Sequence, residues 1–317
     1  MTATDLPTVD LSLPEPELVP VIKMACMEHG FFYLENHGVP AELLDSAMAQ
    51  QRALFSLSPA QKAAMLADGN NRGYTPMKEE TLDPDNQSTG DTKEGFYIGR
   101  EVASNSEEAR KPLHGPNQWP PEDILPEYRP VTSNYIKKVT DVGFRMLELL
   151  ALSLGLERRW FHDKFSHPMI ALRPLHYSAE VSRLDNGVMA AGAHTDYGMI
   201  TLLLLDDQPG LQICHKGEWL DVPPRSCCFV VNLGDMLERW TNGMYKSTLH
   251  RVLNLTGQER YSLPFFFEPN FDAVVECILP CCQGQAAQFP PTTSGAYLLG
   301  RYKATHANFK ADTQAKV

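Results

Sequence analysis

The sequence predicts an α+β protein whose core is mainly β, and three observations support this. After residue 165, short apolar runs follow one another at intervals of about ten residues, a spacing typical of an all-β sandwich or barrel. Turn signals such as Asn242-Gly243 separate these runs. Before residue 165, apolar residues recur mostly at helical spacing. The chain has 317 residues and is 43% hydrophobic, which is enough apolar material for a large core.

The N-terminal half predicts helices, one strand and a long loop. Apolar residues at helical spacing predict helices over residues 18–30, 40–62 and 133–154, of which the last is the longest. The aromatic run 30–34 predicts a strand. The polar stretch 69–93 predicts a loop, and a loop of that length in a compact domain is more often functional than idle.

The C-terminal half predicts a β core. We expect an N-terminal region over 1–130 (helices, strands and a loop) and a C-terminal region over 131–317 (the long helix, the β core and a final segment), packed as one compact unit. The predicted strands cover 170–172, 199–205, 211–213, 227–232, 249–255 and 261–267.

Charge and hydropathy exclude several classes of function. The chain has 39 acidic and 28 basic side chains, a formal charge of −11, whereas phosphate binding needs a basic footprint. No apolar run approaches the roughly 18 residues of a membrane span. Residues 1–7 have neither the basic nor the apolar region of a secretory signal. We therefore expect a cytoplasmic protein without nucleic-acid or membrane partners.

The cysteines predict a reduced protein. The seven cysteines form an odd set without a Cys-x-x-Cys pair, so reduced structural thiols are the simplest interpretation. Two doublets occur, Cys227-Cys228 and Cys281-Cys282. Because neighbouring residues of a strand face opposite ways, a doublet does not easily chelate one metal ion.

The strongest local signal for chemistry is His194-Thr-Asp196, just before an apolar run. On a strand, residues i and i+2 share a face about 6.6 Å apart, so both side chains can converge on one ion. Taken alone, the pair also fits a turn in which Asp196 bonds a backbone amide. His250, at the start of another β run, is the best candidate for a third ligand. Two imidazoles and a carboxylate form the facial triad of non-haem Fe(II) oxygenases, whereas a structural zinc site usually has four ligands including thiolates.

A possible anion site follows ten residues later. Arg260 and Ser262 share one strand face, and a guanidinium inside a barrel requires an anionic partner because an unpaired buried charge is costly. A carboxylate held by N–H and O–H donors would satisfy it. The alternative is a surface arginine paired with Glu259 or Glu268.

The ordered set of motifs resembles the isopenicillin-N-synthase-like branch of the Fe(II)/2-oxoglutarate-dependent dioxygenases. The resemblance covers roughly residues 6–300, and its core is His194-x-Asp196, His250 and Arg260-x-Ser262 in this order and spacing. Residues 232–236 and 241–250 resemble the strand and hairpin that lead to the distal iron histidine. Further similar segments are Gly30–Leu34 with Asn36–Val39, Pro209–Ile213 and Phe267–Asn270.

The resemblance implies a fold and a reaction. The fold is a double-stranded β-helix (jelly roll) with a helical N-terminal region and flanking helices. His194, Asp196 and His250 would hold Fe(II), with 2-oxoglutarate as co-substrate and O₂ as oxidant. Arg260, Ser262 and Tyr177 would hold the far carboxylate of 2-oxoglutarate. Its decarboxylation to succinate and CO₂ would drive hydroxylation, desaturation or cyclisation of a small-molecule metabolite. Ser178 follows Tyr177 where many relatives have proline, so the next turn is expected to differ.

Substrate contacts are expected from the N-terminal wall of the pocket. By resemblance, Gly73–Pro76 and Lys93–Gly99 form this wall, although core aromatics and an ordinary loop explain these residues equally well. Phe96 and Tyr97 alternate across a strand, so at most one faces inward. Arg173 contacts substrate or co-substrate, or is a surface arginine.

Two other histidines are not expected to bind the metal ion. His176 is adjacent to Tyr177 and therefore should face away from the iron. His37 resembles a structural turn of the family.

Three other functions remain open at this point. The first is an Fe(II) oxidase of the same fold that uses no 2-oxoglutarate, in which Arg260 and Ser262 grip the substrate's own carboxylate. The second is a zinc hydrolase with the same ligands, although no candidate general base accompanies them. The third is a non-catalytic binding module, which the intact triad disfavours. We expect a monomer; the sequence does not identify the substrate.

Overall fold

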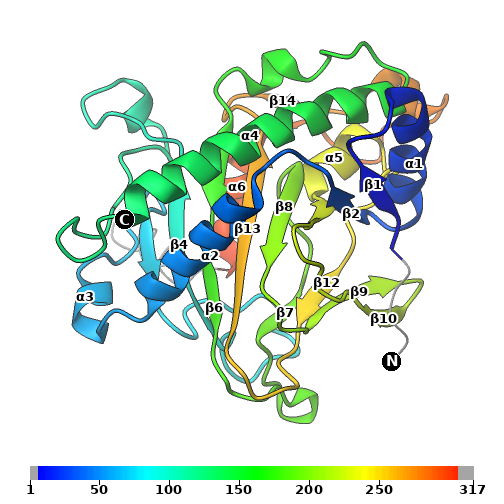
Figure 1. Ribbon diagram of the computed structural model, residues 1–317. Helices are drawn as coiled ribbons and strands as arrows, with labels where there is room; N and C mark the ends of the chain where they lie inside the picture. The colour runs from blue at the N-terminus through cyan, green and yellow to red at the C-terminus, as the bar shows by residue number, and fades with distance from the viewer. Residues whose placement is uncertain (1–5, 306–317) are drawn as a thin grey trace, which may run out of the picture.

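The computed structural model describes residues 6–305, and two β-sheets form its centre (Figure 1). The larger sheet has nine strands in the order β1-β2-β11-β8-β13-β5-β4-β3, with β6 pairing with β13 and β4. The smaller sheet has the order β10-β9-β12-β7. A short pair, β14 (Val274–Val275) and β15 (Thr292–Thr293), lies apart from them. The larger sheet contains β1 (Thr8–Asp10), β2 (Phe31–Glu35), β3 (Gly73–Thr75), β4 (Lys93–Gly99), β5 (Met169–Leu172), β6 (Leu175–Tyr177), β8 (Ile200–Leu205), β11 (Phe229–Leu233) and β13 (Arg260–Glu268), and the smaller one β7 (Ala191–His194), β9 (Leu211–His215), β10 (Glu218–Asp221) and β12 (His250–Val252).

Helices cover the outer face of the larger sheet. In Figure 1, α4 and α2 lie next to each other across this face, and both contact β13. Among the described residues, no helix combines the length and apolar character that crossing a membrane requires. The helices are α1 (Glu15–Glu28), α2 (Ala41–Phe55), α3 (Pro59–Ala63), α4 (Tyr128–Ser153), α5 (Asp235–Trp240) and α6 (Ser294–Thr305), with 3₁₀ turns at Glu108–Arg110, His162–Phe165, Leu184–Asn186 and Leu279–Cys282.

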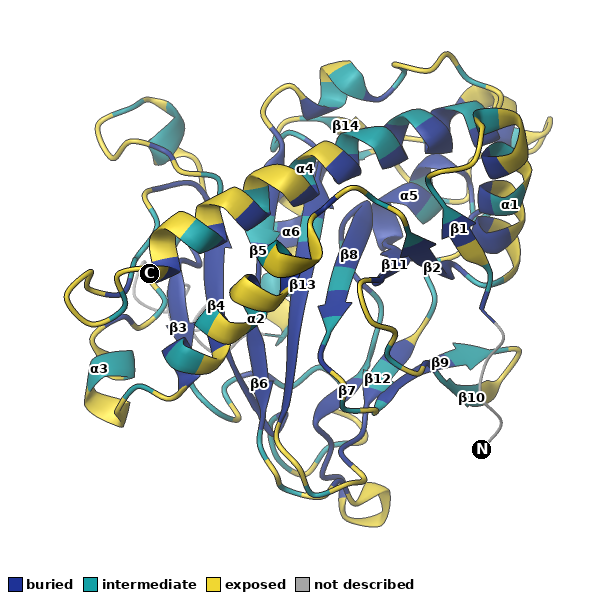
Figure 2. Cartoon of the chain, viewed as in Figure 1, coloured by how far each residue is buried: buried dark blue, intermediate teal, exposed yellow. Residues whose placement is uncertain are grey.

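The main core lies between α4 and the larger sheet. Along α4, buried residues such as Tyr135, Val139 and Met146 recur every three or four positions, while its opposite side is exposed (Figure 2). Gly143 of α4 faces the Phe267 ring of β13, and a Cβ at Gly143 would lie 2.8 Å from that ring. The helix can therefore approach the sheet this closely only with glycine at this position.

Most predicted elements are confirmed, and the differences have local causes. The helix predicted over 40–62 is two helices, because Ser58 and Gln61 form a capping box that starts α3. The long helix begins earlier than predicted, at Tyr128, and Pro130 lies within its first turn, where its missing N–H has no intrahelical acceptor. The hairpin expected before His250 is wrong, since β11 leads instead into α5.

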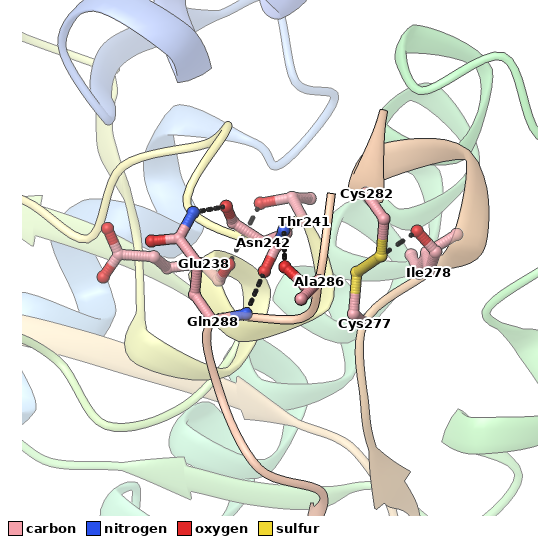
Figure 3. Close-up of a disulfide and its surroundings, with 8 residues drawn as sticks. All are labelled: Glu238, Thr241, Asn242, Cys277, Ile278, Cys282, Ala286 and Gln288. Carbon is pink, nitrogen blue, oxygen red and sulfur yellow. Dashed lines mark hydrogen bonds between the residues drawn. A yellow bond between two sulfur atoms is a disulfide. The ribbon is translucent and has the colours of Figure 1, made fainter. Parts of the chain in front are cut away.

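The expectation that all cysteines are reduced is also wrong. Cys277 and Cys282 form a disulfide, with their Cα atoms 6.7 Å apart (Figure 3). The turn through Leu279–Cys282 brings these two residues together, a proximity that spacing along a strand does not reveal. The other five cysteines are free.

The N-terminal region shares the larger sheet with the C-terminal region. Strand β2 pairs with β11, and β4 pairs with β5 and β6. The predicted boundary after residue 130 falls within the first turn of α4 and stays a prediction. The extreme ends of the two predicted ranges, 1–5 and 306–317, lie outside the described residues, as does most of the N-terminal segment in which no secretory signal was found.

Candidate active site

Three predicted ligands converge at the smaller sheet. His194 ends β7 and His250 begins β12, and the two residues are directly paired across these antiparallel strands. Their ring centroids are 4.3 Å apart. Asp196 was expected on the same strand as His194 but lies in the loop after β7. Its Oδ1 is 3.9 Å from His194 Nε2 and 3.7 Å from His250 Nε2, and one ligand atom from each residue lies within 4.8 Å of the others.

Backbone carbonyls orient both imidazoles. His194 Nδ1 donates to the carbonyl of Gly192 at 2.8 Å, and His250 Nδ1 donates to the carbonyl of Thr248 at 3.0 Å. A carbonyl oxygen only accepts, so each neutral ring carries its proton on Nδ1 and has a lone pair on Nε2. Burial, together with the neighbouring His250, lowers the pKa of His194 to about 3. His194 is therefore neutral at neutral pH and can ligate a metal ion through Nε2.

Two side chains of the larger sheet hold Asp196. Thr201 Oγ1 on β8 and Asn232 Nδ2 on β11 both donate to Asp196 Oδ2, the second at 2.6 Å. Burial acts to raise the pKa of Asp196, but the imidazoles and these two hydrogen bonds outweigh it and hold the pKa below its usual value. The carboxylate stays ionised, with Oδ1 directed at the histidines. We had not predicted roles for Thr201 or Asn232, although Thr201 is the single polar residue in the run 199–205.

The triad lies in a cavity between the two sheets. The cavity volume is about 90 Å³. Its walls include Leu203 and Pro264 from the larger sheet and Leu211 and Val252 from the smaller one. Strand β13 divides this cavity from the core, because alternate residues of a strand face opposite sides. On β13, the cavity-lining residues are Arg260, Ser262, Pro264, Phe266 and Glu268, and the core-facing ones are Tyr261, Leu263, Phe265 and Phe267.

The predicted carboxylate-binding residues meet in the same cavity. Arg260 is 2% exposed, and among the described residues its Nη1 has no hydrogen-bond partner. Its Nε donates to the carbonyl of Gln208 at 3.3 Å, and its guanidinium lies 4.8 Å from the centre of the Tyr177 ring. The Ser262 hydroxyl donates to the Tyr177 hydroxyl at 3.4 Å. The surface alternative for Arg260 is wrong, and the buried, unsatisfied guanidinium fits an incoming carboxylate.

The structure separates the two aromatic candidates of β4. Tyr97 lines the cavity. Phe96 lies on the other face, in the core, with its ring 6.4 Å from that of Tyr128, so its predicted substrate contact is wrong. The alternation of side chains along a strand explains why only one of them faces inward.

Arg173 and His176, on either side of the start of β6, also face different surroundings. Arg173 lines the cavity at 7% exposure, so its surface alternative is wrong. His176 faces away as expected, where it bonds Glu94 at 2.8 Å and stacks on Tyr261 at 4.7 Å.

Several cavity residues were missed by the sequence analysis. Helix α6 contributes Leu298 and Tyr302 to the cavity, and no motif marks this helix. Glu268, at the end of β13, accepts a hydrogen bond from the Met199 amide at 2.8 Å, and burial raises the pKa of its carboxyl to about 8. Glu80 and Tyr197 are further lining residues that were missed, whereas Lys93 belongs to the predicted wall segment Lys93–Gly99.

This donor set fits a reactive, partly open metal centre. Two neutral imidazoles and one carboxylate are typical ligands of non-haem iron. Within the described residues, these three form the only His/Cys/Asp/Glu group with metal-binding geometry, so no fourth protein ligand closes the site. Open coordination positions next to an unsatisfied arginine fit a bidentate co-substrate with a distal carboxylate.

Comparisons with known proteins agree with this geometry. Residues 167–269 match the family model described as the 2OG-Fe(II) oxygenase superfamily. Residues 6–122 match the model described as the N-terminal region of a non-haem dioxygenase in morphine synthesis.

Curated relatives cover nearly the whole chain. The 2-oxoglutarate-Fe(II) type oxidoreductase hxnY of Emericella nidulans is 36% identical, over 93% of this chain and 86% of the relative. Kihadalactone A synthase LFS of Citrus sinensis is 34% identical, over 98% of this chain and 95% of the relative.

Solved structures share the fold. The crystal structure of a full-length Neurospora crassa protein in complex with alpha-KG aligns with a TM-score of 0.83 at 28% identity, covering 93% of this chain and 95% of that one. A putative 2OG-Fe(II) oxygenase family protein from Caulobacter crescentus aligns with a TM-score of 0.84 at 29% identity, covering 95% and 99% of the two chains. The core is accordingly the predicted jelly roll. The chain belongs to the 2OG-Fe(II) oxygenase superfamily and is an Fe(II)- and 2-oxoglutarate-dependent dioxygenase.

Proposed function

We propose that His194, Asp196 and His250 bind the catalytic Fe(II). The observation that carries this proposal is their convergence: the two Nε2 atoms and Asp196 Oδ1 face one another in a buried cavity. The backbone acceptors of the histidines and the donors to Asp196 hold all three side chains in place before metal binding.

We propose that Arg260, Ser262 and Tyr177 bind the distal carboxylate of 2-oxoglutarate. The unsatisfied Arg260 Nη1 and the two hydroxyls would each gain an acceptor, and charge-assisted hydrogen bonds contribute roughly 1.5–3 kcal/mol each. When bound, the iron supplies the activation of O₂. In the hydroxylation case, R–H, 2-oxoglutarate and O₂ yield R–OH, succinate and CO₂.

We propose that a small molecule occupies the other end of the cavity. Tyr97, Arg173 and Tyr302 line that end and would orient the substrate beside the metal. A cavity of about 90 Å³ favours a compact metabolite. The apolar walls exclude water from the reacting bond, which limits side reactions.

We propose that the enzyme acts as a monomer in the cytoplasm, without nucleic-acid or membrane partners. The charge of −11 supports the absence of nucleic-acid partners, because it repels polyanions. Sedimentation should give a particle near 35.5 kDa, and a stable dimer would contradict the monomer.

The co-substrate assignment has a direct test. Protein supplied with Fe(II) and 2-oxoglutarate under air should form succinate and CO₂ in equal amounts, even slowly without substrate. Under anaerobic conditions, 2-oxoglutarate should change the visible spectrum of the Fe(II) protein. An unchanged spectrum together with no succinate would favour the oxidase or hydrolase alternatives.

A further inference from the structure

A buried chain of alternating charges runs beside the cavity from Lys93, which pairs with Tyr177 on the neighbouring strand, to Arg173 at the proposed substrate end. Lys93 contacts both Asp91 and Glu80, the latter at 2.8 Å. Glu80 Oε1 in turn accepts a hydrogen bond from Arg173 Nη1 at 3.2 Å, and Glu80 Oε2 forms an ion pair with Arg173 Nη2 at 2.9 Å. The four side chains are at most 9% exposed. Two cations and two carboxylates therefore balance one another away from water, as buried charges must.

Asp91, the carboxylate at the far end of this chain, has several hydrogen-bond donors around it. Asp91 accepts hydrogen bonds from the Gly192 amide at 2.9 Å and from Gln87 Nε2 at 2.8 Å, in addition to its contact with Lys93. Burial raises the pKa of Asp91, and these three donors act against that shift. Lys93 is thus shared between two resident carboxylates and offers no free charge to a ligand.

Arg173 is consequently unlike Arg260. The two terminal nitrogens of its guanidinium face Glu80, and the guanidinium lies 4.5 Å from the centre of the Tyr97 ring. Its buried Nε has no hydrogen-bond partner among the described residues. Because Glu80 neutralises the charge of Arg173, the remaining N–H donors suit a neutral acceptor such as a carbonyl or hydroxyl oxygen, and not a second carboxylate.

Glu268 gives the cavity a further hydrogen-bonding group that carries no positive charge. Its carboxyl lines the same cavity, and among the described residues no cation pairs with it. If ionised, this group repels a substrate carboxylate; if protonated, it donates a hydrogen bond to a neutral acceptor. The raised pKa of Glu268 favours the protonated form.

The remaining walls favour a flat molecule. Tyr197 and Tyr302 pack edge to face with ring centroids 6.0 Å apart, and Phe266 lines the same cavity. Aromatic walls bind flat apolar surfaces by stacking and edge contacts.

We propose that the substrate is a flat, uncharged small molecule with a hydrogen-bond acceptor for Arg173, and that Glu80 makes the pocket reject carboxylates by occupying Arg173. This inference rests on the proposed function, because that function assigns this end of the cavity to the substrate.

The test compares amides with carboxylates of the same shape. The probes are benzamide and benzoate, phenylacetamide and phenylacetate, and indole-3-acetamide and indole-3-acetate. Binding is measured by calorimetry on protein saturated with Mn(II) and 2-oxoglutarate, so that Arg260 is already occupied. At least one amide should bind at least about tenfold more tightly than its carboxylate. Equal or tighter carboxylate binding, or no amide binding at millimolar concentration, would overturn the proposal.

Substitution of Glu80 should reverse this preference. In Glu80→Gln, Arg173 loses its counter-ion, so the carboxylate of the same pair should gain about tenfold or more over the amide. Glu94→Gln is the matched control, because Glu94 of β4 is also a buried carboxylate but pairs with Lys62 and His176 outside this cavity. An unchanged preference in a folded Glu80→Gln variant would contradict the proposal.

A second variant covers the case in which Glu80→Gln does not fold. Arg173→Met removes the N–H donors of this side chain and should weaken amide binding about tenfold. Binding of 2-oxoglutarate to the Mn(II) protein is measured on every sample. Its failure in the unsubstituted protein would contradict the proposed function, whereas intact 2-oxoglutarate binding without amide preference would contradict only the substrate class.

Discussion

Two arginines line one cavity, and they differ in what surrounds them. Arg260 is buried with an unpaired Nη1, beside two hydroxyl groups. Arg173 is buried and paired with Glu80 through one hydrogen bond and one ion-pair contact, next to a second ion pair. The first environment lacks an anion and the second already contains one.

This difference shows how one enzyme can handle a charged co-substrate and an uncharged substrate in adjacent sites. A buried guanidinium requires a counter-ion from somewhere. If the protein provides no counter-ion, as at Arg260, the ligand has to carry the negative charge. If the protein already provides one, as Glu80 does for Arg173, a negatively charged ligand is disfavoured. The local partner of each arginine, and not the arginine itself, sets the charge of what binds.

The largest effect is expected at the metal ligands, on which the co-substrate end depends. His250→Ala removes one of three ligands and should weaken Fe(II) or Mn(II) binding on the order of 10²-fold or more. Equilibrium dialysis with metal analysis measures this. His176→Ala is the matched control, because His176 faces away from the site. Equal losses in both variants would contradict the assigned ligands.

The two arginines can be compared directly. Arg260→Gln should weaken 2-oxoglutarate binding to the Mn(II) protein by about 10- to 100-fold, the loss of roughly 1.5–3 kcal/mol from a charge-assisted bond. Arg173→Gln should change the affinity for 2-oxoglutarate by less than about twofold, because Arg173 is already paired with Glu80. Calorimetry gives both values. If Arg173→Gln has the larger effect, the two ends of the cavity are assigned the wrong way round.

A smaller effect is expected from the donors to Asp196. Asn232→Ala removes the hydrogen bond to Oδ2 and should weaken metal binding about tenfold, as is typical for groups that orient a ligand. Thr201→Val removes the other donor and tests the same role. Metal titration of both variants checks this. Unchanged affinity in both would mean that Asp196 needs no support.

The last effect concerns the pH dependence of stability and the uncharged end, and it is small for each pH unit. Glu268 has its pKa raised from 4.5 to about 8, so between these values the folded state holds a proton that the unfolded state has lost. Its contribution to the free energy of unfolding is therefore complete below about pH 4.5 and is lost as pH rises towards 8, at on the order of 1 kcal/mol per pH unit.

This pH dependence can be measured by denaturation. Urea titrations of metal-free protein from about pH 5 to about pH 8.5 should show less of this decline in Glu268→Gln, which stays neutral throughout. Identical slopes in the two proteins would show that Glu268 ionises normally.

The co-substrate end was largely predictable from the sequence, and the substrate end was not. The ligands and the Arg260-x-Ser262 pair lie at fixed spacing on or beside strands, where alternation determines which side chains share a face. The pairing of His194 with His250 then follows from the sheet. The same alternation limited Phe96 and Tyr97 to one inward side chain without saying which.

The substrate end depends on contacts between distant segments. Glu80 lies in a loop without periodicity, and it meets Arg173 only after β4 and β6 have paired. Tyr302 arrives on α6, near the end of the described chain, with no motif to mark it. Loops and terminal helices are placed by tertiary packing, so their partners are not encoded in local spacing.

The most direct test of the two-ended cavity is a crystal structure with Mn(II) and 2-oxoglutarate bound. We expect one metal ion bonded to the Nε2 atoms of His194 and His250 and to Asp196 Oδ1, with the distal carboxylate of 2-oxoglutarate on Arg260 and the Arg173–Glu80 pair intact. A metal ion elsewhere, or a 2-oxoglutarate carboxylate on Arg173 in place of Glu80, would contradict the assignment.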